Sequence, residues 1–268
     1  MADIAALLDD LRAEGDDLER LVAPLADDAW STATPAEGWT IAHQIAHLAW
    51  TDDAALLAVA DPEEFTGPHL REALAAYEQG RDPVDEGAAV GVTTPPADLL
   101  DRWGRGRAAL QETLREHAAS GAKIPWYGPP MSVASMVTAR QMETWAHGQD
   151  VADALGVTRE PTARLRHVAH IGVRTRNFAY AAHQEQPPEQ EFRVELTAPD
   201  GEQWTWGPDD AAQRVTGPAL DFALLVTQRR HVDDLALAAD GEDPQHWLTI
   251  AQAFAGPPGA GREAGQFA

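Results

Sequence analysis

The chain has 268 residues and a mass of 28.9 kDa, a length that favours two compact domains over one. Its 43 acidic residues against 20 lysines and arginines give a net charge of −23, which disfavours nucleic acids and anionic membranes as partners. The sequence has no cysteine, which excludes disulfides, thiolate metal ligands and a cysteine nucleophile, and no apolar run long enough to span a bilayer.

Four long helices are predicted in the first half of the chain. Each follows a helical period of apolar residues, and Asp3, Thr40 and Ser132 stand where N-terminal capping residues are expected. Gly156 is typical of the residue that follows a helix end. The expected segments are residues 3–22, 41–58, 99–114 and 132–155. Four helices joined by crossing connections favour an up-and-down four-helix bundle.

Between the second and third helices, residues 61–96 are poorer in apolar residues and richer in proline, glycine and acids. We expect a long connection with one short helix at about Leu70–Tyr77. An insertion of this length is usually functional or mobile.

The second half of the chain changes character. A fifth helix is expected over residues 161–183, followed by a polar linker over 184–190. Alternating apolar and polar residues then predict a hairpin of Phe192–Leu196 and Gln203–Trp206, with a third strand near Gln213–Val215. Two further helices are expected at about 219–228 and 247–254. The predicted domains are therefore a helical bundle over 1–184, a small α+β domain over 190–256 and a flexible tail over 257–268.

Glu143 and His147 are the sharpest local feature of the fourth helix. They stand four residues apart, so both side chains project from one helical face and can bind one cation. The same spacing also occurs by chance on solvated helix faces. Apolar neighbours such as Met136 and Met142 favour a buried face, where a carboxylate needs a partner such as a metal.

The second helix carries a similar pair, His43 and His47. Taken singly, each is more typical of a hydrogen-bonded core histidine than of a metal ligand. A histidine from this helix together with the pair on the fourth helix would nevertheless give three ligands and leave a coordination position open, as in catalytic metal sites.

Three segments carry a resemblance to a known family: Pro35–Thr40, Gln44–Leu48 and Met142–Asp150. They resemble the DinB-like metalloprotein superfamily and, within it, the actinobacterial mycothiol-dependent maleylpyruvate isomerase family. The resemblance implies a DinB-like four-helix bundle followed by a small α+β C-terminal domain. It also implies a divalent metal, usually zinc, held by a histidine of the second helix and by a glutamate and a histidine of the last. The matching residues here are His47, Glu143 and His147.

The resemblance further implies an active-site arginine in the C-terminal domain, which Arg229 matches best, with Arg230 as the alternative. A zinc ion with an open position can hold a thiol as thiolate, and mycothiol would supply the thiol that this chain lacks. The function implied is a metal- and mycothiol-dependent isomerase or thiol S-transferase that acts on a small, maleylpyruvate-like electrophile. The alternatives are a DinB-like hydrolase and a metal-binding protein without catalysis.

Other residues keep more than one interpretation. His43 could be a spare ligand, a group behind the ligands or a residue of the helix cap, and Asp150 could orient His147 or begin a solvated helix end. Trp126 and Tyr127, in a proline-rich loop, could border a pocket. The expected partners are a small-molecule substrate and a low-molecular-weight thiol. The N-terminal residues show no basic region leading into an apolar one, so we expect a cytoplasmic location.

Overall fold

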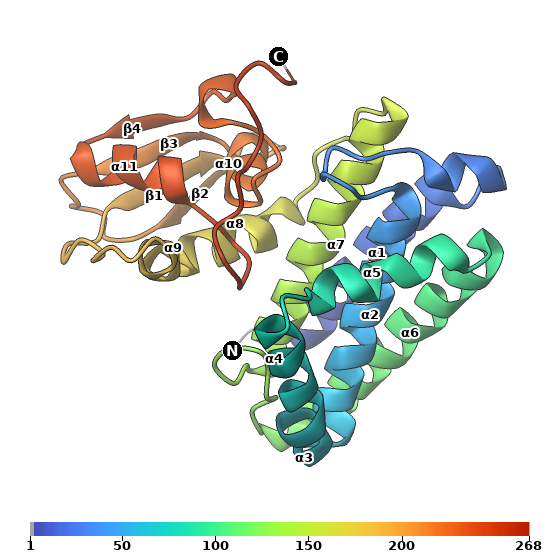
Figure 1. Ribbon diagram of the computed structural model, residues 1–268. Helices are drawn as coiled ribbons and strands as arrows, with labels where there is room; N and C mark the ends of the chain where they lie inside the picture. The colour runs from blue at the N-terminus through green and yellow to red at the C-terminus, as the bar shows by residue number, and fades with distance from the viewer. Residues whose placement is uncertain (1–2, 268) are drawn as a thin grey trace. The chain divides into compact units, whose positions relative to one another are not determined.

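The computed structural model describes residues 3–267, which fall into two compact units that divide between Arg159 and Glu160 (Figure 1). The first unit is helical, and the second combines helices with a sheet. Each unit is described by itself below. None of the described helices combines the length and the apolar character that a membrane crossing requires.

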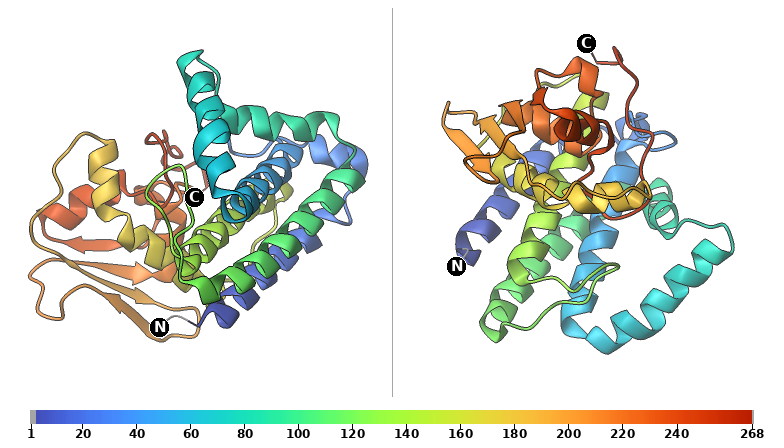
Figure 2. Two further views of the ribbon diagram at one scale, coloured as in Figure 1. Left: turned by 90° about the horizontal axis from the view of Figure 1, so that it is seen from below. Right: turned by 90° about the vertical axis from the view of Figure 1, so that its left-hand side faces the viewer.

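Four long helices form the body of the first unit and lie side by side (Figures 1 and 2). They are α1 (Ile4–Val22), α2 (Ile41–Ala60), α6 (Pro96–His117) and α7 (Val133–Leu155). The α2 helix contacts both α6 and α7, and α1 contacts the same two helices. The predicted four-helix bundle is therefore confirmed.

Local capping chemistry fixes where these helices begin and end. The carboxylate of Asp3 accepts hydrogen bonds from the backbone N–H groups of Ala5 and Ala6, and the Ser132 hydroxyl accepts from Ser135. At the end of α7, Gly156 adopts a positive φ of 65°, the left-handed conformation that closes a helix. Among the described residues, short 3-10 helices cover Asp27–Ser31 and Ala118–Ser120 in the first unit and Val232–Asp234 in the second.

The connection between α2 and α6 is largely helical: the short helix predicted at Leu70–Tyr77 is confirmed, but the prediction that it is the single helix there was wrong. It contains α3 (Pro62–Glu64), the π-helical turn η2 (Phe65–His69), α4 (Leu70–Glu78) and α5 (Pro83–Thr93). The α5 helix contacts α2 along its length through small residues, so it lacks the apolar stripe by which a surface helix is identified from sequence.

Two glycines allow α5 to approach α2 closely. A Cβ atom on Gly91 would lie 2.4 Å from the carbonyl oxygen of Ala42 and 2.8 Å from the Cβ of Ala46. A Cβ on Gly87, one turn earlier, would lie 2.8 Å from the ring of Trp50. Real side chains essentially never show contacts this short, so the packing of α5 and the position of the Trp50 ring both depend on glycine.

We therefore expect Gly91→Ala to destabilise the first unit. Overpacking against a backbone carbonyl costs roughly 1–3 kcal/mol, more than the roughly 0.5–1 kcal/mol that alanine contributes in a helix interior. Gly104→Ala is the matched control, because Gly104 lies inside α6 with nothing within 4 Å of its would-be Cβ. Urea denaturation should show a lower free energy of unfolding for Gly91→Ala and a higher one for Gly104→Ala. Equal stabilisation by both would contradict the close approach.

Arg159, which follows α7 and is the last residue of the first unit, contacts α1 through its side chain. Its guanidinium forms an ion pair with Glu14, a carboxylate only 1% exposed, and donates to the carbonyl oxygen of Trp145 at 2.9 Å. The side chain of Gln141 also donates to Glu14, at 3.3 Å.

The described residues of the second unit form a four-stranded mixed sheet with helices. The strands are β1 (Arg193–Thr197), β2 (Gln203–Trp206), β3 (Arg214–Pro218) and β4 (Ala238–Asp240), in the order β2-β1-β3-β4. β1 pairs antiparallel with β2 and parallel with β3, and β4 is antiparallel to β3. The predicted hairpin and third strand are confirmed, as is the α+β class of this unit. The helices are α8 (Leu165–Arg174), α9 (Arg176–Ala182), α10 (Ala219–Val226) and α11 (Glu242–Ile250).

The division between the units lies before the fifth predicted helix, whereas the sequence placed it after that helix, at 184–190. The segment breaks at Thr175 into α8 and α9, which contact α10 and α11 respectively. The contact is tight, because a Cβ on Gly172 of α8 would lie 2.7 Å from the side chain of Val226. The tail, expected to be flexible, contacts the same unit, where the N–H of Gly265 donates to Asp234 at 2.8 Å.

Candidate metal centre

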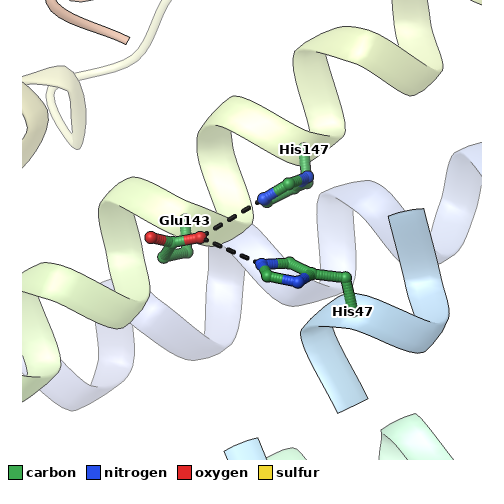
Figure 3. A group of neighbouring side chains, drawn as sticks. All are labelled: His47, Glu143 and His147. Carbon is green, nitrogen blue, oxygen red and sulfur yellow. Dashed lines mark hydrogen bonds and ion pairs between the residues drawn. The ribbon is translucent and has the colours of Figure 1, made fainter. Parts of the chain in front are cut away.

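Two helices of the first unit bring His47, Glu143 and His147 together (Figure 3). Oε2 of Glu143, on α7, lies 3.4 Å from Nε2 of His47, on α2, and 3.2 Å from Nε2 of His147, one turn further along α7. Each residue offers one ligand atom, and these atoms all lie within 4.8 Å of one another. The three residues singled out in the sequence therefore form one group.

The side chains of His47, Glu143 and His147 are mostly, but not completely, buried. The exposed fraction of the side chain is 8% for His47, 12% for His147 and 22% for Glu143. The histidines lie on the inner faces of their helices, while Glu143 keeps one side accessible. A metal ion held by all three would thus be only partly shielded from solvent, through the exposed part of Glu143.

A chain of hydrogen bonds fixes which nitrogen of His147 carries a proton. The Thr34 hydroxyl donates its single hydrogen to the carbonyl oxygen of Trp39, so it can only accept from the amide nitrogen of Gln44. The amide oxygen of Gln44 then faces Nδ1 of His147, which must be protonated to donate to it. In a neutral imidazole this leaves the Nε2 lone pair directed at Glu143.

This arrangement fits a cation between the side chains. The Nε2 lone pair of His147 and the carboxylate of Glu143 face each other at 3.2 Å, and they attract only if a second proton or a metal ion lies between them. Four-coordinate zinc with bonds of about 2.0–2.1 Å places its ligand atoms about 3.3 Å apart. The separations of 3.2 and 3.4 Å from Oε2 of Glu143 to the two imidazoles match that spacing.

Glu143 is suited to an anionic role at this position. Burial by itself would raise the pKa of its carboxyl group, but hydrogen bonds from His147 and His47, made when a proton occupies the nitrogen that faces Glu143, and the charge of Arg140 outweigh burial. The pKa of Glu143 therefore lies well below its ordinary value, and the group is a carboxylate at neutral pH.

Arg140 belongs to a buried polar cluster one turn before Glu143 on α7. Its side chain is 3% exposed, its Nε lies 3.3 Å from Oδ1 of Asp52, and its Nη2 donates to the Thr51 hydroxyl at 2.9 Å. That hydroxyl donates in turn to the backbone carbonyl of His47 at 2.9 Å. Burial raises the pKa of Asp52 to about 6, although the charge of Arg140 opposes the shift. The cluster thus links the two helices that carry the candidate ligands.

His43 belongs to the helix cap. Its Nδ1 accepts a hydrogen bond from the backbone N–H of Thr40 at 3.1 Å, while the Thr40 side chain caps the first turn of α2 in return. Burial lowers the pKa of His43, which keeps this nitrogen free to accept. Of the three interpretations of His43, the structure selects the cap residue.

The other predicted residues are placed less directly. Asp150 is fully buried, so it does not begin a solvated helix end. The hydrogen-bond partner of Nδ1 of His147 is the side chain of Gln44. Arg229 lies in the second unit just after α10 and donates to the carbonyl oxygen of Thr227 at 2.5 Å, so its active-site role stays a prediction. Arg230 lies 4.0 Å from the ring of Phe267 and lines a cavity of about 350 Å³ in the same unit.

Aromatic rings that the sequence analysis did not single out surround the group. The ring of Trp39 stands 5.3 Å from that of His47 and stacks on that of His147 at 5.9 Å, between ring centroids. Its indole N–H donates to Asp85 of α5 at 2.9 Å. On another side, the Trp50 ring lies 6.1 Å from the ring of His47. A helical period cannot identify Trp39, because this residue lies in a loop before α2.

Comparison with known proteins matches the two units to different families. Residues 11–152 match the family model described as the mycothiol maleylpyruvate isomerase N-terminal domain. Residues 188–240 match the one described as wyosine base formation. Proteins named as uncharacterized in two strains of Mycobacterium tuberculosis are 56% identical over 262 residues, which covers 98% of this chain and 100% of each relative.

Among solved structures, the crystal structure of the mycothiol-dependent maleylpyruvate isomerase is similar to this chain at a TM-score of 0.59 and 17% sequence identity. The match covers 90% of this chain and 96% of that one. A histidine-to-alanine mutant of that isomerase matches at a TM-score of 0.58. At this identity the likeness establishes a shared fold.

Proposed function

Because this chain belongs to the family of the mycothiol maleylpyruvate isomerase N-terminal domain, we propose that it is a metal-dependent enzyme that uses a low-molecular-weight thiol, mycothiol, on a small electrophile. The reaction is a cis–trans isomerisation of a maleylpyruvate-like substrate or a transfer of the thiol to it. The observation that carries the proposal is the convergence of His47, Glu143 and His147, with Glu143 still 22% exposed.

The donor set suits zinc, with two imidazole nitrogens and one carboxylate oxygen. Bound there, a divalent ion would supply the positive charge that holds a thiol in its thiolate form near neutral pH. The protein contributes the orientation of its ligands, in particular the Gln44 amide that keeps Nε2 of His147 unprotonated. Because the chain has no cysteine of its own, a nucleophilic sulfur has to come from a cosubstrate.

The proposed chemistry follows from these roles. The sulfur adds to the activated carbon of a cis double bond, and the electron pair moves onto the conjugated carbonyl oxygen. Rotation about the resulting single bond and expulsion of the same thiol release the trans isomer, so the thiol is regenerated. With an electrophile that cannot expel the sulfur, the product is the thioether. Arg229 is our candidate for binding a substrate carboxylate, because a guanidinium can donate two parallel hydrogen bonds to it.

The test is turnover by the zinc-loaded full-length protein with maleylpyruvate and uncharged enones, with mycothiol, with glutathione and without thiol. We expect turnover that requires both metal and mycothiol, and a higher KM for maleylpyruvate in Arg229→Gln without a change for the uncharged enones. Activity that persists without any thiol would point to a hydrolase. Metal binding without turnover of any substrate would indicate a binding protein.

A further inference from the structure

A continuous row of aromatic side chains leads away from the candidate metal centre within the first unit. Trp50 lies between His47, at 6.1 Å, and Tyr127, at 6.2 Å with the rings stacked at 22°. Both Trp50 and Tyr127 are partly exposed, the latter by 39%, so these rings belong to the surface beside the centre. The position of Trp50 is set by Gly87, which leaves no room for any side chain beneath the indole.

Tyr127 is held at this surface by more than ring stacking. Its hydroxyl oxygen lies 2.6 Å from Nε2 of His69, which is the last residue of the π-helical turn η2. Phe65, the first residue of that turn, is buried and meets the Tyr127 ring edge-on at 5.4 Å. π-Helical turns are rare in proteins as a whole, but those that occur are often found at functional sites.

The hydroxyl of Tyr127 is suited to donate a hydrogen bond. Burial and the neighbouring Tyr77 raise its pKa to about 12, so the phenol keeps its proton at neutral pH. When Nε2 of His69 is protonated, the imidazole donates to the phenolic oxygen and leaves the hydroxyl hydrogen for another acceptor. The Trp50 ring neighbours both the ring of His47 and that of Tyr127, so the phenol and the candidate ligand border the same region.

We propose that Tyr127, positioned by His69, contacts the electrophile and donates a hydrogen bond to its carbonyl oxygen. This inference rests on the proposed function, because addition of a thiolate to an enone places negative charge on that oxygen. A donor aimed at the developing charge stabilises the transition state more than the ground state. Tyr127 is then a catalytic residue, and His69 is a positioning residue that acts through it.

A structural role for the same residues makes a different prediction. If the pair of Tyr127 and His69 only fastens the proline-rich loop to η2, removal of the hydroxyl lowers stability and leaves the chemistry of the folded protein unchanged. Tyr127→Phe keeps the ring contacts and removes only the hydroxyl, so it separates the two roles. Tyr77→Phe is the matched control, since it likewise removes one phenol hydroxyl, from a neighbouring tyrosine on α4.

The experiment uses the full-length zinc-loaded protein and two readouts. In steady-state kinetics with an uncharged enone, Tyr127→Phe is expected to lower kcat about 100-fold with little change in the KM for mycothiol, and Tyr77→Phe to be close to wild type. His69→Leu should lower kcat similarly, whereas His69→Gln, whose amide can still donate to the phenol, should recover most of it. Metal content and the melting temperature are measured for each variant.

The second readout does not need turnover. Calorimetry compares the 2-oxopropyl thioether of mycothiol, which carries a carbonyl, with the propyl thioether, which does not. Tyr127→Phe should weaken binding of the first about tenfold and leave the second unchanged. Wild-type kinetic constants and affinities in Tyr127→Phe would overturn the inference. A wild-type protein that binds the thioethers without turning over an enone would refute the proposed function alone, and one that binds neither would refute both.

Discussion

Alanine at position 147 is expected to lower the affinity of the protein for zinc by more than about 100-fold. His147 supplies one of three converging ligand atoms, and even a residue that only supports a ligand changes affinity by roughly 10–100-fold. His47→Ala should have the same effect, because its imidazole reaches the group from the other helix. Elemental analysis after dialysis and competition with a chromophoric chelator measure the loss.

The same titration distinguishes ligands from their supports. Gln44→Met removes the amide that holds Nδ1 of His147 and should weaken binding by roughly 10–100-fold, less than loss of the ligand itself. Gln149→Met is its control, because that side chain donates to Asp153 at the far end of α7. His43→Ala should cost stability through the lost cap but retain the metal. A full metal complement in both ligand variants would refute the assignment.

The second large effect is expected from Arg140→Met, which should lower the free energy of unfolding by about 3–5 kcal/mol. The guanidinium is buried against Asp52, so its removal leaves a carboxyl group in the core without its cation. Arg102→Met is the matched control, since Arg102 pairs with the adjacent Asp53 at 2.7 Å on the surface. Its exposed pair should contribute under about 1 kcal/mol. Urea denaturation of the metal-free proteins provides both values.

The cost of Arg140→Met should also depend on pH. Burial raises the pKa of Asp52 from 3.8 to about 6, so the folded state binds a proton that the unfolded state has lost within that range. The contribution of Asp52 to the free energy of unfolding is therefore greatest below its pKa in the unfolded state. That contribution decreases as the pH rises through its pKa in the folded state. Without Arg140 the folded pKa rises further, and the decrease continues to higher pH. The variant should be closer to wild type at pH 5 than at pH 8, and an equal difference at both would contradict this.

Sequence signals that act within a few residues predicted the bundle well. Asp3 and Ser132 accept backbone hydrogen bonds where a cap was expected, and Gly156 ends α7 in the left-handed conformation. Such interactions depend on neighbours in the chain and can be identified without a fold. The spacing of Glu143 and His147 belongs to the same class, because four residues along a helix bring two side chains together.

Features that depend on distant contacts were not predictable in the same way. The α5 helix packs through Gly87 and Gly91, which in sequence are typical of a loop. The β4 strand has three residues and exists because β3 pairs with it. Likewise, α8 belongs to the second unit through its contact with α10, some fifty residues later.

Within the candidate centre, Gln44 shows most clearly what spacing cannot reveal. A glutamine beside a histidine in a helix has no characteristic pattern. Its role follows from the Thr34 hydroxyl, whose only hydrogen is used by the carbonyl of Trp39. Three residues from a loop and a helix thus fix the protonation of His147 on another helix, and only the folded chain brings them together.

The ion pair of Glu14 with Arg159 has a consequence for biosynthesis. The two residues are 145 positions apart, so Glu14 leaves the ribosome long before Arg159, the residue that neutralises its carboxylate in the folded unit. The growing chain can assemble the helices earlier, yet its first unit does not reach full stability until residue 159 has left the exit tunnel. The match to the N-terminal family ends at residue 152, and a fragment that stops there would keep Glu14 permanently without this partner.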